Sequence, residues 1–105
     1  RDARPFYTKI SDDGVHTESF DCIFKGTEIT SGGQRADKHS DYINAMEAKG
    51  IDPSDFKFYL DNFKYGFPVH GGFAIGLERL TAKLCDLPSV KMASLFPRDT
   101  DRLTP

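Results

Sequence analysis

The stretch HGGFAIGLERL, residues 70–80, decides the fold that the sequence predicts. In its first half, glycine and other small residues alternate with Phe73 and Ile75, which is the period of a strand whose side chains point to opposite faces in turn. Leucines then recur at helical spacing over residues 77–84, and Pro88 follows. We therefore predict a strand that runs directly into a helix.

Two further helices are predicted before this stretch. Ser40 is expected to cap the first helix, and Gly50 fits the position just after its end. Asp52 and Pro53 are expected to open the second helix, and Gly66 ends it. The apolar positions, at helical spacing, are Tyr42, Ile43 and Met46 in the first helix and Phe56, Tyr59, Leu60 and Phe63 in the second.

The first third of the chain is predicted to form strands. Residues 5–10 are a short β-type run, and residues 18–25 alternate as a half-buried antiparallel strand does. The residues of its more apolar face are Phe20, Cys22 and Phe24. Gly26 marks a tight turn, after which residues 27–31 restart a strand that is expected to stop at the glycine pair beyond it. We expect an α+β fold: about four antiparallel strands in one sheet, with packed helices.

Composition excludes several classes of function. The chain has 105 residues, which allows one small domain or part of a larger one, and its formal net charge is −2. There is no run of basic residues to attract nucleic acid, and no apolar stretch approaches the length of a membrane span. Cys22 and Cys85 stand far apart with no CxxC, so we expect reduced thiols in a cytoplasmic protein rather than a zinc site or a disulfide framework.

Residues 28–35, EITSGGQR, place an acid, a hydroxyl and a guanidinium around a glycine pair. The glycines let the backbone come close to a bound group and let a strand bend. Glu28 and Ser31 could share a hard cation through oxygen ligands, and Arg35 could grip a carboxylate with two parallel hydrogen bonds. The alternative is a strand end with a glycine turn and solvated charges.

Residues 70–80 carry a second set of candidate residues. Gly72 and Gly76 keep one face of the predicted strand bare, so that a flat ligand such as a nucleobase could lie there. Glu78 and Arg79 stand in the first turn of the following helix, from which an arginine can reach a phosphate or stack on a ring. The stretch is neither a dinucleotide-binding fingerprint nor a P-loop. The alternative is a strand packed on a helix, with Glu78 and Arg79 as a surface pair.

Two weaker features remain. His70 either lines a ligand pocket or fills a turn. The tail, residues 94–105, is predicted to be irregular and to be fixed by an Arg98–Asp99 pair.

Taken together, three segments resemble class II aspartyl-tRNA synthetases, most closely those of the archaeal and eukaryotic type. The segments are EITSGGQR at residues 28–35, HGGFAIGLERL at residues 70–80 and LFPRDTDRLTP at residues 95–105. RPFYT at residues 4–8 and SFDCIFKG at residues 19–26 are similar to further segments of the same catalytic domain. The resemblance covers nearly the whole chain, and it implies that residues 1–105 are the C-terminal portion of a class II synthetase catalytic domain.

The resemblance implies which residues bind ATP. Residues 70–80 are similar to motif 3, a strand-to-helix element of the ATP site, although Ala74 stands where the family often has a third glycine. Arg79 matches the motif 3 arginine, which lies against the bent ATP near the adenine and the γ-phosphate. The neighbouring stretch that contacts ATP is matched by Gly76, Leu77 and Glu78.

The resemblance also implies metal and substrate ligands. Glu28 matches the acid that binds ATP through Mg²⁺, and with Arg79 it is expected to be catalytic. Ser31 matches the hydroxyl position near Mg²⁺ and the amino acid. Arg35 matches the arginine that pairs with the side-chain carboxylate of L-aspartate. A bidentate arginine would reject the neutral amide of asparagine, because the charge would be left unpaired.

The activity implied is that of an aspartate–tRNA ligase, which joins aspartate to tRNA(Asp) through an aspartyl-adenylate. ATP is a substrate, Mg²⁺ a cofactor, and the implied enzyme is a cytoplasmic homodimer; tRNA(Asn) stays open as a second substrate. Motifs 1 and 2 and the anticodon-binding OB domain are expected upstream of Arg1, so the isolated piece is expected to be inactive. The alternatives are an asparaginyl- or lysyl-tRNA synthetase fragment and a non-catalytic synthetase-like binding module.

Overall fold

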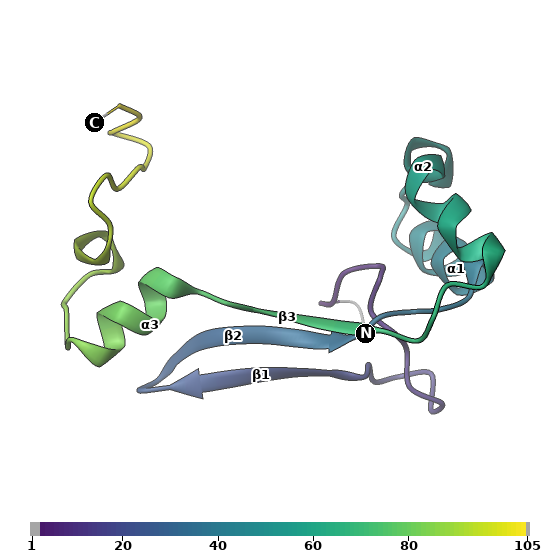
Figure 1. Ribbon diagram of the computed structural model, residues 1–105, viewed down its shortest axis with the longest axis horizontal. Helices are drawn as coiled ribbons and strands as arrows, with labels where there is room; N and C mark the ends of the chain where they lie inside the picture. Colours follow the sequence, from purple (N-terminus) through teal and green to yellow (C-terminus); the bar gives the residue numbers. More distant parts are fainter. Residues whose placement is uncertain (1–2, 105) are drawn as a thin grey trace. The chain divides into compact units, whose positions relative to one another are not determined.

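The computed structural model describes residues 3–104 and contains one sheet and several short helices (Figure 1). Arg1, Asp2 and Pro105, the last residue of the family-like tail, lie outside the described residues. The strands are β1 (Ser19–Phe24), β2 (Thr27–Gln34) and β3 (Gly71–Ile75). The helical elements are α1 (His39–Ala48), η1 (Pro53–Phe56), α2 (Lys57–Leu60), η2 (Asp61–Tyr65), α3 (Leu77–Leu84) and η3 (Val90–Ala93), where η marks a 3-10 helix.

The sheet has the strand order β1-β2-β3 and is antiparallel. A tight turn joins β1 to β2 through Lys25 and Gly26, both of which have positive φ, as a two-residue hairpin requires. Between β2 and β3 the Arg35 N–H donates to the His70 carbonyl at 3.0 Å, and the Gly76 N–H donates to the Ile29 carbonyl at 2.8 Å. The predicted α+β class is confirmed.

The predicted number of about four strands is wrong, because residues 3–104 form three. The run at residues 5–10 pairs only at isolated bridges, Thr8 with Arg35 and Ile10 with Thr17. The Thr8 N–H turns back to the Pro5 carbonyl at 3.1 Å, and proline has no N–H to offer a neighbouring strand. The start of this run therefore forms a turn rather than a strand.

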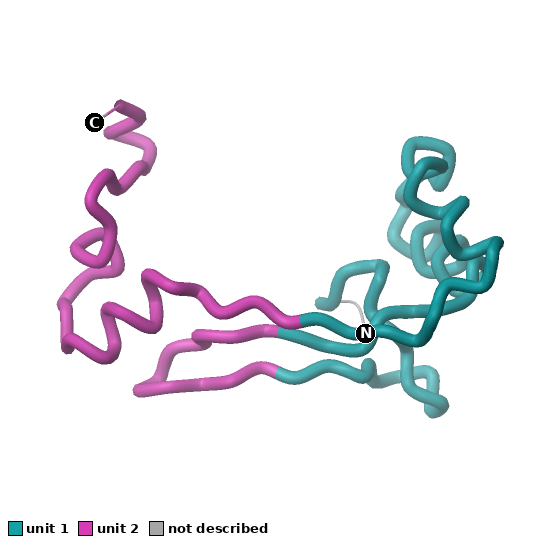
Figure 2. Tube along the Cα trace, viewed as in Figure 1, with its two compact units in different colours: residues 1–20, 32–72 teal, residues 21–31, 73–105 magenta. Residues whose placement is uncertain are grey.

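The chain divides into two compact units (Figure 2). Unit 1 contains residues 3–20 and 32–72 of the described chain, and unit 2 contains residues 21–31 and 73–104. None of the described helices has the length and apolar character of a membrane span, and the longest, α1, has 10 residues.

Unit 1 has a hydrophobic core built from α1 and the segment η1-α2-η2. Tyr42 and Met46 are fully buried one helical turn apart on α1, and the Tyr42 hydroxyl donates to the Ala36 carbonyl at 2.7 Å. Burial raises the pKa of Tyr42 well above its usual range. The buried residues of this core are Ala36, Tyr42, Met46, Leu60 and Phe63. The predicted apolar stripe of the first helix is therefore confirmed, with Tyr42 and Met46 fully buried and Ile43 partly buried against the same core.

The predicted end of α1 is confirmed, but its predicted start is wrong. Gly50 has φ +68, and its N–H donates to the Glu47 carbonyl at 3.0 Å, as expected just after a helix end. The helix begins at His39, so Lys38 rather than Ser40 is the N-cap, without a side-chain hydrogen bond. The Ser40 hydroxyl contacts the Asp41 carboxylate at 3.4 Å instead. The spacing of apolar residues places a helix on the chain, but it does not fix its first residue to within one or two positions.

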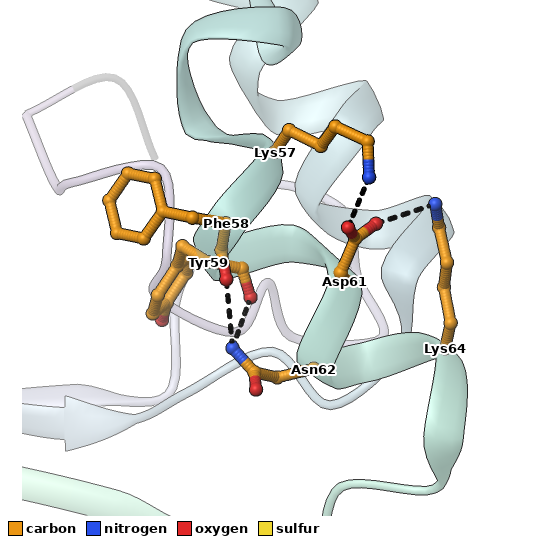
Figure 3. Close-up of polar contacts among 6 residues, drawn as sticks. All are labelled: Lys57, Phe58, Tyr59, Asp61, Asn62 and Lys64. Carbon is orange, nitrogen blue, oxygen red and sulfur yellow. Dashed lines mark hydrogen bonds and ion pairs between the residues drawn. The ribbon is translucent and has the colours of Figure 1, made fainter.

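The second predicted helix is mostly 3-10 helix. Its predicted ends are confirmed: Asp52 Oδ1 accepts the Ser54 N–H at 2.9 Å, and Gly66 has φ +80. In Figure 3 the Asn62 amide donates to the carbonyls of Phe58 and Tyr59, at 3.2 and 2.9 Å. Such side-chain bonds compete with the regular backbone ladder, and beyond Leu60 the segment continues as η2.

The predictions for β1 and β2 are wrong in two respects. Phe20 and Ile23, which alternation puts on opposite faces of β1, are 51% and 62% exposed, and only the end residues Ser19 and Phe24 are partly buried. β2 does not stop before its glycine pair but continues to Gln34. Gly33 allows this, because a Cβ there would lie 2.7 Å from the Glu18 carbonyl oxygen and 3.0 Å from Ser19 Cα.

Gly33→Ala is expected to lower the free energy of unfolding by about 1–3 kcal/mol, because β1 would have to shift away from β2. Urea unfolding of the 105-residue chain measures this. The control is Gly72→Ala, whose Cβ would meet its nearest neighbour at 3.4 Å, an ordinary contact. Equal losses for the two variants would contradict the steric reading.

Asp61 supplies a second test of unit 1. Lys57 and Lys64 both pair with its carboxylate (Figure 3), and these contacts lower the pKa of Asp61 to about 2. The contribution to stability is complete above the unfolded pKa of about 3.9 and is lost as the pH falls through about 2. The urea midpoint of the wild type should therefore be higher than that of Asp61→Asn at about pH 5, and this difference should disappear as the pH falls to about 2. An advantage that persists at the lower pH, or one that Asp55→Asn reproduces, would refute this.

Candidate active site

In unit 2, the passage from β3 into α3 positions Arg79. Gly76 is the N-cap of α3, and its carbonyl accepts the Leu80 N–H at 2.9 Å, the first hydrogen bond of the helix. The Gly76 N–H is held by β2 through Ile29. Arg79 thus leaves the first turn of α3 beside the start of β2. The predicted strand-to-helix element is confirmed.

Arg79 meets Glu28 in this unit. Arg79 Nη1 donates to the Glu28 backbone carbonyl at 3.0 Å and lies 3.7 Å from Glu28 Oε1. The two side chains are 53% and 45% exposed, so both polar ends remain accessible to a ligand. The structure therefore brings together the two residues that were predicted to be catalytic.

The Arg79 side chain lies beside Gly76, where the sequence predicted space for a flat ligand. A Cβ at this position would lie 3.5–3.6 Å from the aliphatic carbons of the Arg79 side chain. The bare position is thus next to the arginine stem, which crosses the strand end on its way to Glu28. This distance is an ordinary van der Waals contact, so the arginine stem would tolerate an alanine at position 76 but would compete with a longer side chain.

The other predicted residues of unit 2 lie around this pair. Leu77 and Glu78 follow Gly76 and are exposed at the start of α3, and Ser31 lies half-buried on β2. Glu28 and Ser31 offer a carboxylate and a hydroxyl, which are oxygen donors of the kind that Mg²⁺ accepts. Within residues 3–104, no three His, Cys, Asp or Glu side chains gather around a common metal position.

Arg35 lies in unit 1 and is held on several sides. Its guanidinium carbon is 4.3 Å from the centre of the Tyr7 ring, a cation–π contact. On β3, a Cβ at Gly72 would lie 3.4 Å from Arg35 Nη2. The backbone N–H of Arg35 is bound to His70. Sequence reasoning missed Tyr7, and the only signal for it was its place in the family-like segment RPFYT.

His70 fills a turn. Its Nδ1 lies 3.0 Å from the Pro68 carbonyl, and its ring stacks at 6.2 Å on Phe63 and meets Phe67 edge-on at 4.7 Å. The contacts of this side chain are therefore those of a packed turn residue, which favours the second of the two readings.

The tail is irregular after η3, as predicted, but Asp99 has a different partner. Its carboxylate pairs with Lys91 and accepts the N–H groups of Asp101 and Arg102, each at 2.8 Å. These contacts lower the pKa of Asp99, with the Lys91 hydrogen bond as the largest cause. The predicted Arg98–Asp99 pair is wrong, because the Asp99 side chain turns back to η3 and to the backbone beyond it.

A cavity of about 610 Å³ lies in unit 1, between residues 5–12 and α1. Its lining includes the charged side chains of Lys9, Asp37, Lys38 and Asp41. None of the site residues predicted from the sequence lines it. Thr8, which bridges to Arg35, and Ala36, the residue after Arg35, border the cavity, but Arg35 itself does not line it.

Comparison with known proteins decides the family. The family model "tRNA synthetases class II (D, K and N)" matches residues 1–100. The chain belongs to this family of class II tRNA synthetases. Over its whole length it is 57% identical to the aspartate–tRNA(Asp/Asn) ligase of Thermus thermophilus, and over 99% of its length it is 45% identical to the aspartate–tRNA(Asp) ligase of Thermococcus kodakarensis. It spans about a quarter of these synthetases, 25% and 24% of their lengths.

Solved class II synthetases share its fold. Aspartyl-tRNA synthetase from Entamoeba histolytica matches with a TM-score of 0.93 and 39% identity, over 99% of this chain and 22% of that one. Asparaginyl-tRNA synthetase from Pyrococcus horikoshii matches with a TM-score of 0.90 and 36% identity, over 97% and 25%. The fold is thus that of part of a class II synthetase, and sequence identity is higher to the aspartate ligases.

The Glu28–Arg79 pair is exposed, and its removal should therefore cost little stability. Glu28→Gln and Arg79→Ala are each expected to change the free energy of unfolding of the 105-residue chain by less than about 1 kcal/mol. Met46→Ala, which empties a fully buried position, should cost about 2–5 kcal/mol in the same urea titration. A loss for Arg79→Ala as large as that for Met46→Ala would make the pair structural.

Proposed function

We propose that this chain is part of an aspartate–tRNA ligase that activates L-aspartate with ATP and transfers it to tRNA(Asp). The observation that carries the proposal is 57% identity over the whole chain to an enzyme named aspartate–tRNA(Asp/Asn) ligase, which leaves tRNA(Asn) open as a second substrate. The half-exposed Glu28–Arg79 pair and the guanidinium of Arg35 supply the charges that the chemistry needs.

Activation joins the aspartate α-carboxylate to the α-phosphate of ATP, and the bond from that phosphate to pyrophosphate breaks. Such a transfer depends on alignment and on neutralising negative charge, and it needs no side-chain nucleophile. Arg79 is proposed to bind the triphosphate, with Gly76, Leu77 and Glu78 beside it along the nucleotide. The ion pair between its guanidinium and the Glu28 carboxylate is long and solvent-exposed, so exchanging that carboxylate for a phosphate costs little.

Glu28 and Ser31 are proposed to hold Mg²⁺. Their two oxygen donors fit this ion, which takes few protein ligands and completes its shell with water and substrate phosphate oxygens. The ion, when bound, neutralises charge on the phosphates. Glu28 then contributes to the ATP site through its carboxylate, while its backbone carbonyl remains available to Arg79.

Arg35 is proposed to select aspartate by binding its side-chain carboxylate. A guanidinium offers two parallel N–H donors to a carboxylate. The amide of asparagine would place an N–H₂ group against one of these donors and leave the positive charge unpaired. Mismatches of this kind discriminate by roughly 10²–10⁴-fold.

The chain is further proposed to be the C-terminal portion of the catalytic domain, in a cytoplasmic homodimer. The support is the motif 3 resemblance of residues 70–80 and the quarter of each relative that the chain spans. Motifs 1 and 2 and the OB domain would then come from outside residues 1–105. Without the motif 2 arginine, the isolated chain should not form the adenylate.

A segment exchange tests the function. The chain replaces the matching quarter of the Thermus thermophilus ligase, and ATP–pyrophosphate exchange is measured with aspartate, asparagine or lysine. We expect exchange with aspartate, and a fall of about 10²–10⁴-fold in kcat/KM for aspartate in Arg35→Gln. The 105-residue chain alone should show no exchange. Arg102→Gln, a change of an exposed tail arginine, is the matched control.

Each other result has a defined meaning. Exchange that prefers asparagine or lysine would replace the proposal with an asparaginyl- or lysyl-tRNA synthetase. A folded hybrid with no exchange for any of the three amino acids would favour the non-catalytic binding module. Full exchange in Arg35→Gln or Arg79→Ala would refute the residue roles while leaving the activity in place.

A further inference from the structure

The guanidinium of Arg35 lies against an aromatic ring. The 4.3 Å from its central carbon to the centre of the Tyr7 ring is well within the range of a cation–π contact. Both residues are half-buried, so water screens the contact less than it would on an open surface. A planar guanidinium stacked in this way keeps its N–H edge free for another partner.

The strand β3 leaves room for the same guanidinium. A Cβ at Gly72 would lie 3.4 Å from Arg35 Nη2 and 3.9 Å from Nε. Any side chain longer than alanine would therefore compete with the guanidinium for this space. Tyr7 and Gly72 together bound the position of the charged group, and we call this pair of contacts the arginine slot.

The arginine slot is tied to the core of unit 1. The Tyr7 carbonyl accepts the Ala36 N–H at 3.0 Å, so the backbone of Tyr7 is joined to the residue that follows Arg35. The Tyr7 ring meets Phe6 edge-on at 5.4 Å, and Phe6 meets Phe56 of η1 at 5.4 Å. The position of the ring is thus fixed by packing rather than by the arginine alone.

We propose that the arginine slot fixes the guanidinium in the orientation that reads the substrate side chain, with Tyr7 as a positioning residue and Gly72 as a determinant of specificity. The proposal rests on the proposed function. A long side chain that is already held loses less freedom when it forms two hydrogen bonds, so it binds the carboxylate more tightly. A guanidinium in one place also makes the penalty for a neutral amide larger, because the charge cannot move to another partner.

The test uses the hybrid synthetase that carries this chain. Tyr7→Leu should raise the KM for aspartate by about 3- to 30-fold, the worth of one cation–π contact, with little change in kcat or in the KM for ATP. Tyr7→Phe keeps the ring and should restore the wild-type KM. Gly72→Val should raise the KM for aspartate in the same way from the other side of the slot, without removing any core side chain.

Phe6→Leu is the matched control. Phe6 contacts the rings of Tyr7 and Phe56, whereas the cation–π contact with Arg35 is made by Tyr7. The change should therefore lower the melting temperature without a selective rise in the KM for aspartate. The proposal is overturned if Tyr7→Leu and Phe6→Leu change the KM for aspartate by the same factor. It is also overturned if Gly72→Val leaves the KM for aspartate unchanged. Failure of the proposed function is distinguishable, because the unmutated hybrid would then already lack aspartate-dependent exchange.

Discussion

The pairing of β2 with β3 is the constraint on which both groups of site residues depend. These strands are separated by the helices of unit 1 in the sequence, and backbone hydrogen bonds join them in each unit. In unit 2 the bond from Gly76 to Ile29 brings the start of α3 to the start of β2, where Arg79 meets Glu28. In unit 1 the bond from Arg35 to His70 brings Arg35 next to β3. The placement of these residues therefore follows from strand register rather than from any contiguous motif.

Gly72 of β3 and Gly76, the N-cap of α3, lie next to arginine side chains rather than under a bare surface. Sequence reasoning expected Gly72 and Gly76 to leave space for a flat ligand. Instead, each lies beside the side chain of an arginine, Arg35 in unit 1 and Arg79 in unit 2. A Cβ would meet the arginine at 3.4 Å from Gly72 and at 3.5–3.6 Å from Gly76, which are ordinary contacts, whereas a larger side chain would compete with the arginine for this space. Small residues at these two positions therefore leave room for the two arginine side chains.

Local signals predicted much of the fold, and pairing decided the rest. Asp52 and Gly66 were predicted correctly because a cap and a left-handed helix end depend only on a few neighbouring residues. The continuation of β2 through Gly33 was not predictable, because it depends on how closely β1 approaches. Alternation in β1 predicted a buried face at Phe20, and alternation cannot say which element covers that face. The contact between Tyr7 and Arg35 likewise joins segments far apart in the sequence.

The two proposed binding tasks make different demands on the chain. Phosphate binding at Arg79 depends on charge and reach, and a half-exposed side chain on the first turn of a helix can supply both. Choice between a carboxylate and an amide depends on the exact place of a charge, since the two groups have nearly the same shape. Arg35 accordingly stands in unit 1, where Tyr7 and Phe6 connect it to the buried residues around Tyr42. Core packing in this unit should therefore matter for amino-acid selectivity and not only for stability.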